Sequence, residues 1–147
     1  MAIFIGIDPG DYTGFAVWDS SAKAFVSVQT LPLWKALDEV KRWRYKCQMS
    51  PAYVGIKVVF EDARQRTWFE KERNASEYRG RLMGAGAAKR DAKVWEEFLQ
   101  DNCIPFEAVK PRPGLTKWKA EYWSHVTGWK GRTSEHARDA ALLVFGR

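Results

Sequence analysis

Apolar and polar positions alternate along the first sixty residues in a way that predicts four β-strands and one helix. Residues 2–8 form an apolar run that ends abruptly in Asp8 and a Pro-Gly pair, as a buried strand ends at the edge of a sheet. Residues 13–18 and 24–29 flank a polar segment and predict a hairpin, so three antiparallel strands begin the chain. Residues 54–60 are a further apolar, β-branched run that predicts another strand.

Helical periodicity begins at Leu33, where apolar residues recur at spacings of three and four with basic residues between them. Four more elements are expected after the fourth strand: a helix from about Ser76 to about Leu99, a strand at residues 104–109, an amphipathic segment around residues 118–123, and a helix capped by Thr133 or Ser134 that reaches Phe145. The order predicts an α/β fold with a five-stranded mixed sheet, its first three strands antiparallel, flanked by helices.

Composition narrows the class of protein. The 147 residues fit a single domain over residues 1–147, and a formal net charge of +6 favours a polyanionic partner. Two cysteines, Cys47 and Cys103, make no disulfide framework and have no zinc-type spacing with histidine. No apolar run is long enough for a signal sequence or a membrane span, so a cytoplasmic protein is expected.

Two of the predicted strands end in acidic residues. Asp8 follows the first strand, and the Pro-Gly pair after it prevents the strand from continuing, so the carboxylate is expected at the sheet edge. Glu61 follows the strand at residues 54–60 in the same way. The two carboxylates converge if these strands are neighbours. Asp62 is the alternative acid at the second strand, and the alternation of the strand favours Glu61.

The last predicted helix adds two further candidate ligands. His136 and Asp139 are three residues apart and therefore share one helix face, with Glu135 held as the alternative to His136. Carboxylates with one imidazole suit Mg²⁺ or Mn²⁺ rather than zinc, and several carboxylates around open water positions are what hydrolysis of a phosphodiester by two metal ions requires. The expected cofactor is therefore Mg²⁺ or Mn²⁺, with two ions per site.

Three segments together resemble a known family of nucleases. GIDPGDYTG at residues 6–14 is similar to the first motif of the RuvC-type Holliday junction resolvases, and FEDAR at residues 60–64 is similar to their second acidic motif. SEHARDAALL at residues 134–143 resembles their terminal helix, in which His or Asp precedes Asp-Ala. The match is closest to the compact resolvases of bacteriophages, and the order of elements is that of the RNase H fold.

The resemblance implies a function and a set of site residues. It implies a homodimer that nicks four-way DNA junctions. The substrates would include forks and flaps if the substrate range is broad. Asp8, Glu61, His136 and Asp139 would be the metal ligands, and Lys117 or Lys119 would assist at the scissile phosphate. The expected DNA contacts are the aromatics Trp68 and Phe69 at the junction centre, phosphate contacts from Arg64, Arg66, Arg73, Arg79 and Arg81, and the two lysines just named.

The sequence also permits two other interpretations. A Gly-Ile-Asp-x-Gly segment followed by Thr-Gly also occurs in the actin and sugar-kinase ATPases, although these bind ATP between two duplicated domains. A protein that binds junctions without cutting them is the other alternative. Trp18, Trp34, Trp43 and Trp95 fit apolar stripes and are expected to fill the core or an interface. Gly80 and Gly84 would permit close approach of DNA or of a second helix.

Overall fold

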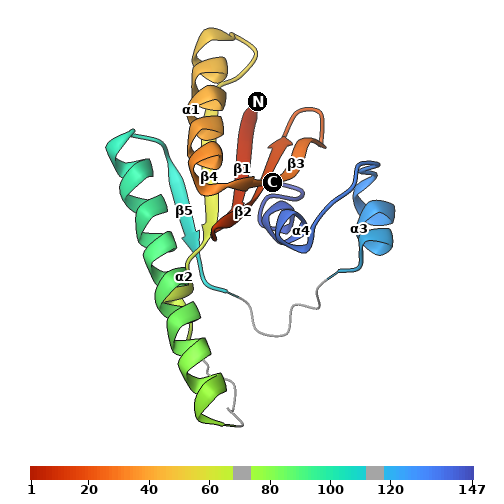
Figure 1. The fold of residues 1–147 in the computed structure, drawn as a ribbon. Coiled ribbons are helices and arrows are strands. Elements are labelled where there is room, and N and C mark those ends of the chain that lie inside the picture. Colours follow the sequence, from red (N-terminus) through yellow and green to blue (C-terminus); the bar gives the residue numbers. More distant parts are fainter. Residues whose placement is uncertain (68–73, 112–117) are drawn as a thin grey trace.

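The computed structural model describes residues 1–67, 74–111 and 118–147. Its centre is a sheet in the order β3-β2-β1-β4-β5 (Figure 1). The strands and helices in chain order are β1 Ala2–Asp8, β2 Tyr12–Asp19, β3 Ala24–Pro32, α1 Leu33–Met49, β4 Gly55–Glu61, the 3-10 turn η1 Ala63–Gln65, α2 Ala75–Asp101, β5 Phe106–Val109, α3 Ala120–Thr127 and α4 Glu135–Leu142. The prediction of an α/β fold with a five-stranded mixed sheet flanked by helices is confirmed.

Pairing within the sheet places the acidic strand ends side by side. β1 pairs with β2 and β2 with β3 in antiparallel fashion, whereas β1 pairs with β4, and β4 with β5, in parallel. The C-terminal ends of β1, β3, β4 and β5 therefore meet at one edge of the sheet, together with the start of β2. We call this the carboxylate edge, because Asp8 and Glu61 end β1 and β4 there.

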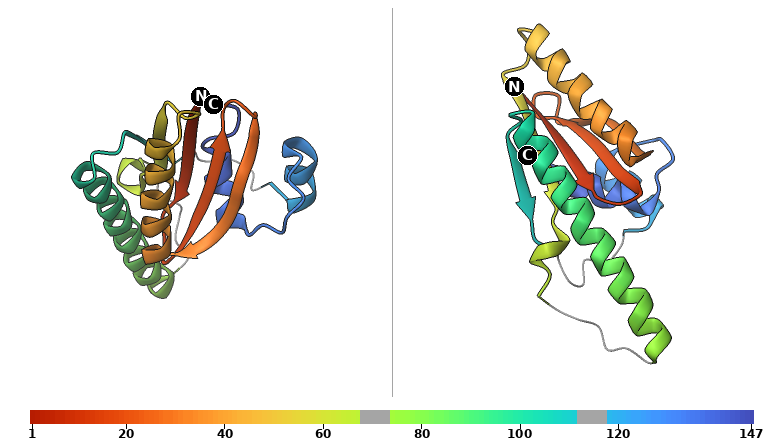
Figure 2. Two further views of the ribbon diagram at one scale, coloured as in Figure 1. Left: turned by 90° about the horizontal axis from the view of Figure 1, so that it is seen from above. Right: turned by 60° about the vertical axis from the view of Figure 1, so that its left-hand side comes forward.

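Helices cover both faces of the sheet (Figure 2). On one face, Ile5 and Ile7 of β1 pack in a buried cluster with Val40 of α1 and Trp95 of α2. On the other face, Ala137, Ala140 and Ala141 of α4 pack against Ala16 of β2. Because side chains alternate along a strand, residues Phe4, Gly6 and Asp8 of β1 face α4. No helix among the described residues is long and apolar enough to cross a membrane.

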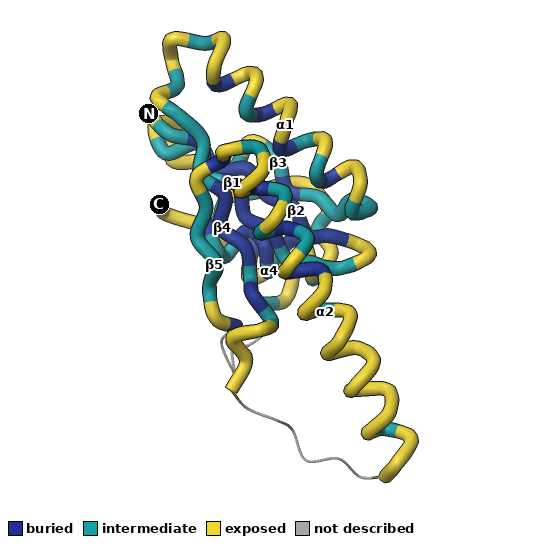
Figure 3. Tube along the Cα trace, turned by 90° about the vertical axis from the view of Figure 1, so that its left-hand side faces the viewer, coloured by how far each residue is buried: buried dark blue, intermediate teal, exposed yellow. Residues whose placement is uncertain are grey.

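Helix α2 extends past the sheet at its N-terminal half. Its buried residues are Asp91, Ala92, Trp95 and Leu99, all in the second half. The first half, residues 75–87, is exposed except for the half-buried Glu77, and it projects beyond the carboxylate edge (Figures 1 and 3). Gly80 and Gly84 lie in this part, where an added Cβ at either position meets nothing within 4 Å.

Three of the four tryptophans expected in the core or at an interface are buried, and one is not. Trp18, Trp43 and Trp95 are buried, which confirms a place in the core for them. Trp34 does not lie in the core, because its exposed fraction is 66%. Helix α1 buries Ala36, Val40, Trp43 and Cys47. Trp34 precedes Ala36 by two residues, roughly 200° round a helix, and so lies on the opposite side from the core.

Candidate active site

Asp8 and Glu61 lie at the ends of neighbouring parallel strands and on the same face of the sheet. Ile7 of β1 is in register with Phe60 of β4, so the two acids follow at equivalent positions. Val58 and Phe60 belong to the core on the α1 and α2 face, whereas Val59 packs with Val144 below α4. The alternation therefore directs Glu61 to the α4 face, as it does Asp8.

Helix α4 approaches this face closely because two glycines leave room for its backbone. An added Cβ at Gly14 would lie 2.0 Å from the carbonyl oxygen of His136, and one at Gly6 would lie 2.0 Å from the carbonyl oxygen of Ala140. The N-terminus of α4 thus rests against β1 and β2 beside Asp8. Ser134 caps the helix by accepting a hydrogen bond from the backbone N–H of Ala137. The close contact of α4 with Gly6 and Gly14 holds His136 and Asp139 at the carboxylate edge.

Electrostatics shows that three carboxylates converge. Burial is the main cause that raises the pKa of Glu61 from 4.5 to about 7, and the negative charges of Asp8 and Asp139 raise it further. The positive charge of Arg66 acts in the opposite direction. Charges that influence one another in this way lie close together. The structure therefore brings residues from β1, β4 and α4 into one acidic site with Arg66 beside it.

His136 contacts the site through Asp8. Its Nδ1 lies 2.8 Å from Oδ2 of Asp8, and because an ionised carboxylate only accepts, the ring nitrogen is the donor. The exposed fraction of the His136 side chain is 61%, and that of Asp8 is 17%. The ring therefore covers Asp8 on the solvent side. For the alternative residue Glu135, the carboxylate oxygen Oε1 is buried.

Asp62 has a structural environment distinct from that of Glu61. Burial alone would raise its pKa, but hydrogen bonds from Arg64 and Gln65 lower it. Arg64 donates from Nε to Oδ1 of Asp62 at 2.8 Å, and from Nη1 to Glu96 of α2 at 2.7 Å. Asp62 also accepts from the backbone N–H of Arg64 and so caps η1. The two adjacent acids therefore have different surroundings. Glu61 belongs to the acidic site, whereas Asp62 caps η1 and holds Arg64, which joins η1 to α2.

Two contacts that sequence reasoning did not identify support the site. Thr13 is fully buried and donates from its hydroxyl to the carbonyl of Gly10 at 2.8 Å, which closes the turn after Asp8. Arg138 lies between the two ligand candidates of α4 and donates to the carbonyls of Trp118 and Thr133 at 2.9 and 2.8 Å. It therefore ties the segment before α3 to the helix. A buried polar residue after a Pro-Gly turn was a usable signal for Thr13, whereas nothing local marks Arg138.

The donor set suits a hard divalent cation, since three carboxylates supply oxygen ligands and His136 one nitrogen. In the side-chain positions of the described residues, no three His, Cys, Asp or Glu groups come close enough together to hold an ion. His136 is instead hydrogen-bonded to Asp8. Metal binding would therefore require the side chains of the site to rearrange, beginning with the bond between His136 and Asp8.

The residues predicted to contact DNA occupy different surroundings. Arg66 is exposed beside Glu61, and Arg79 and Arg81 are exposed on the projecting half of α2. Arg64 is engaged by two carboxylates, a pairing that competes with phosphate binding. Lys119 is exposed at the N-cap of α3. Four predicted residues lie outside the described residues, namely Trp68, Phe69, Arg73 and Lys117.

Comparison with known protein families and with curated proteins identifies no relative of the chain. No protein-family model matches the chain, and a search of curated proteins gives no significant match. The assignment of the site therefore rests on the geometry and chemistry of its own residues.

Proposed function

We propose that this protein is a metal-dependent, structure-selective endonuclease of the RuvC type, within the RNase H-like superfamily, that nicks Holliday junctions and other branched DNA. The observation that carries the proposal is the meeting of Asp8, Glu61 and Asp139 at one sheet edge. Each comes from one of the three motifs that resemble this family. The strand order β3-β2-β1-β4-β5, with β1, β4 and β5 parallel, supports the RNase H-like assignment.

The chemistry of the site agrees with phosphodiester hydrolysis. Two bound Mg²⁺ or Mn²⁺ ions would activate the attacking water and stabilise the leaving oxygen. Asp8, Glu61 and Asp139 would hold these ions, with His136 as the fourth ligand in place of its present bond to Asp8. Burial chiefly, and repulsion from Asp8 and Asp139 in addition, raise the pKa of Glu61, and a bound cation would offset both effects by favouring the ionised carboxylate.

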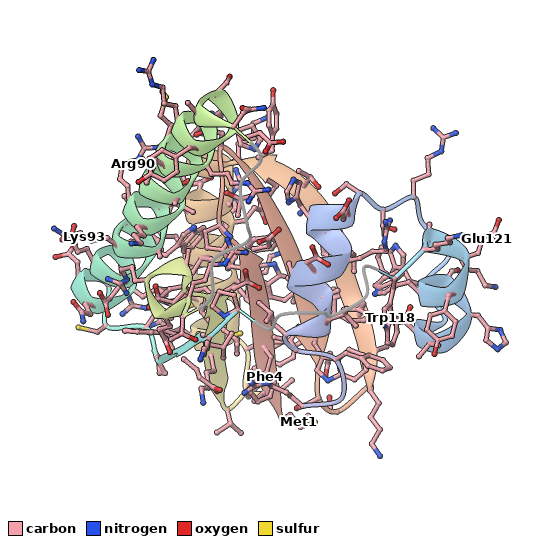
Figure 4. All side chains as sticks on the ribbon, turned by 90° about the horizontal axis from the view of Figure 1, so that it is seen from below. Met1, Phe4, Arg90, Lys93, Trp118 and Glu121 are labelled. Carbon is pink, nitrogen blue, oxygen red and sulfur yellow. The ribbon has the colours of Figure 1, made fainter. Side chains whose placement is uncertain are left out.

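Basic residues on both sides of the carboxylate edge would hold the phosphate backbone. The first nineteen residues of α2, 75–93, carry five exposed basic residues, Arg79, Arg81, Lys89, Arg90 and Lys93. Arg90 is paired with Asp91 and Lys93 with Glu97, so phosphate binding there would compete with these ion pairs. Seen from below the sheet, α2 with Arg90 and Lys93 lies on one side, and the segment with Trp118 and α3 lies on the other (Figure 4). On that second side Lys119, Lys130 and Arg132 are exposed. A branched duplex can therefore contact positive charge on two sides of the acids.

A homodimer completes the proposal, because paired nicks on opposed strands of a four-way junction require two sites. The family resemblance favours this arrangement. The projecting half of α2, with Gly80 and Gly84 open to solvent, is a surface on which a second copy can pack.

The test incubates the purified protein with a labelled four-way junction or a matched linear duplex, in Mg²⁺, Mn²⁺ or EDTA. Wild type is compared with Asp139→Asn and Glu61→Gln, and the matched controls Asp101→Asn and Glu97→Gln change exposed acids at the far end of α2. The expected result is metal-dependent, paired nicks on the junction by wild type and both controls. The two site variants should bind the junction without cutting it, because the ligands are lost while the basic surface remains.

Other outcomes refute specific parts of the proposal. Junction binding by wild type without cleavage in any metal would support the binding-only alternative. Loss of junction binding by both site variants, with the folded state retained, would refute the assignment of these acids as metal ligands. Tight ATP binding without DNA cleavage would favour the ATPase alternative.

A further inference from the structure

One guanidinium group binds both ends of a surface segment that contains α3. The segment, residues 118–133, ends at the residue before the N-cap of α4, and we call it the α3 segment. Nε of Arg138 donates to the carbonyl of Trp118 at 2.9 Å. Nη1 of Arg138 donates to the carbonyl of Thr133 at 2.8 Å and to its hydroxyl at 3.1 Å. Because Trp118 and Thr133 are the first and last residues of the segment, a single side chain of α4 closes it.

Apolar packing fixes the middle of the α3 segment on the same helix. Trp123 is buried in a cluster with Ala137 of α4, and Trp129 packs against this cluster. The hydroxyl of Ser124 donates to the carbonyl of Trp129 at 2.5 Å, which holds the turn after α3. The α3 segment therefore rests on α4 at its centre through Trp123 and at its two ends through Arg138.

Arg138 is a half-buried cation whose bonds go to uncharged acceptors. Within the part of the chain that the structure describes, it forms no ion pair with a carboxylate. It follows His136 by two residues, roughly 200° round the helix, and so lies on a different side of α4 from that candidate ligand. The planar guanidinium offers several fixed donors, which suits bonds to two separate carbonyls better than the single ammonium of lysine does. Arg138 therefore acts on the segment that it holds, whereas the acids lie on another side of its helix.

The α3 segment carries positive charge next to both of its bonded ends. Lys119 follows one bonded residue and Arg132 precedes the other, and both side chains are exposed. Neither forms an ion pair among the described residues. Residues 118–133 contain three basic residues against one acid, Glu121. Since each of the two cations is adjacent to a residue that Arg138 holds, this side chain fixes where both charges stand beside α4.

We propose that Arg138 is a positioning residue for substrate binding, which holds Lys119 and Arg132 where they contact the phosphates of a DNA arm whose cleaved strand lies at the acids. The inference rests on the proposed function and deepens it, because it names the contact that joins the basic surface of α3 to the helix that carries Asp139. Figure 4 shows Trp118 between α4 and α3, where this contact is made. Cations on a fixed segment lose less conformational freedom on binding phosphate than cations on a loose one, so the bonds of Arg138 raise the affinity for DNA.

The test measures the affinity for a labelled four-way junction by fluorescence anisotropy in EDTA, at salt concentrations from about 50 to 200 mM. Arg138→Lys keeps the charge and removes the bonding of both ends. A double variant, Lys119→Ala with Arg132→Ala, removes the two cations, and a triple variant combines all three changes. The matched control is Arg42→Lys, which makes the same change at an exposed arginine of α1, on the other face of the sheet.

Loss of two phosphate contacts in the double variant should lower the slope of log affinity against log salt by about two. Arg138→Lys should lower this slope by about one or more at unchanged net charge. The triple variant should bind about as well as the double variant, because cations that are no longer held in place contribute little to lose. Arg42→Lys should keep the slope of wild type.

A purely structural role of Arg138 would lower the urea midpoint and leave the salt slope unchanged, so both are measured. If Arg138→Lys does not fold, Thr133→Val replaces it, since that change removes only the hydroxyl bond at 3.1 Å and keeps Arg138. A smaller decrease of the slope in the same direction is then expected, and an unchanged slope would overturn the inference.

The outcomes separate this inference from the proposed function, which the junction-cleavage assay tests on its own. Additive losses in the triple variant, or an Arg138→Lys slope equal to that of wild type, would overturn the inference even if the junction is cut. Unchanged junction binding by the double variant would overturn it as well. Non-additive losses in a protein that cuts no junction in any metal would support the positioning role and refute the nuclease.

Discussion

Replacing Gly14 by alanine places a methyl group where α4 already lies. The added Cβ would be 2.0 Å from the carbonyl oxygen of His136 and 2.5 Å from its carbonyl carbon, whereas ordinary contacts begin at 3.4 Å. The helix backbone must therefore move by about 1.4 Å, because the obstacle is main chain rather than a flexible side chain. Overpacking of this kind costs about 1 to 3 kcal/mol, and we expect the upper part of that range.

The assay is urea unfolding followed by tryptophan fluorescence. With a slope of about 2 kcal/mol per molar urea, a loss of about 2 to 3 kcal/mol lowers the midpoint by about 1 M. Gly55→Ala is the matched control, since Gly55 lies in the same sheet and an added Cβ there meets nothing within 4 Å. It should leave the midpoint unchanged or raise it slightly.

The same substitution also tests how the site is positioned. A shift of about 1 Å in the N-terminus of α4 moves His136 and Asp139 away from Asp8, and a misplacement of that size can reduce a reaction rate about 100-fold. We therefore expect the Gly14→Ala variant to lose metal-dependent cleavage even at a low temperature at which it still folds. A Gly14→Ala variant as stable and as active as wild type would refute the close packing of α4 on β2.

Three further predictions concern charge and helix stability. Glu61→Gln should stabilise the protein above pH 7 by up to about 3 kcal/mol and have no effect near pH 4, because the raised pKa means that stability of wild type falls as the pH rises from 4.5 to about 7. Arg64→Ala should destabilise the folded protein by about 2 kcal/mol at pH 7, since it leaves the buried carboxylate of Asp62 without its main hydrogen-bond donor. Because the pKa of Asp62 is lowered in the folded protein, the stability difference between variant and wild type is lost as the pH falls through that folded pKa. In dilute protein, where single chains predominate, Gly84→Ala should raise the melting temperature by about 3 °C, because the helix is exposed there and alanine favours the helix by about 1 kcal/mol.

Each of these has a measurement that can contradict it. For Glu61→Gln, urea midpoints are compared at pH 4 and pH 8, with Glu97→Gln as the control on an exposed acid. Equal midpoints of variant and wild type at pH 8 would mean that neither burial nor the neighbouring carboxylates raise the pKa of Glu61. For Arg64→Ala, an undiminished midpoint at pH 7 would show that the bond to Asp62 is not stabilising. For Gly84→Ala, a lower melting temperature that depends on protein concentration would show that a second copy packs on α2.

The sequence by itself determined most elements of the fold and which residue types stand at the strand ends and on the last helix. A run of apolar residues that stops at an acid is a local pattern, and it located both Asp8 and Glu61 at strand ends. Alternation within β4 is local too, and it favoured Glu61 over Asp62. The spacing of His136 and Asp139 in a helix with a serine cap was likewise visible in the sequence.

Only the tertiary structure decided how these parts meet. The pairing of β1 with β4 brings the two acids together, and the pairing involves residues about fifty positions apart. Gly6 and Gly14 matter because another segment's backbone fills the space beside them, which no property of the glycines themselves reveals. The sequence predicted Arg64 as a phosphate contact, whereas the folded chain pairs it with Asp62 and Glu96.

Trp34 shows the same limit most clearly. Its apolar character and its place in an amphipathic helix favoured the core, but α1 buries the face that begins at Ala36. The sheet beneath a helix decides which side of the helix is covered. Besides β3, which precedes α1, this sheet contains four other strands from elsewhere in the chain. Local periodicity therefore indicates which residues share a face of a helix or strand. Long-range packing decides whether that face contacts the core or the solvent.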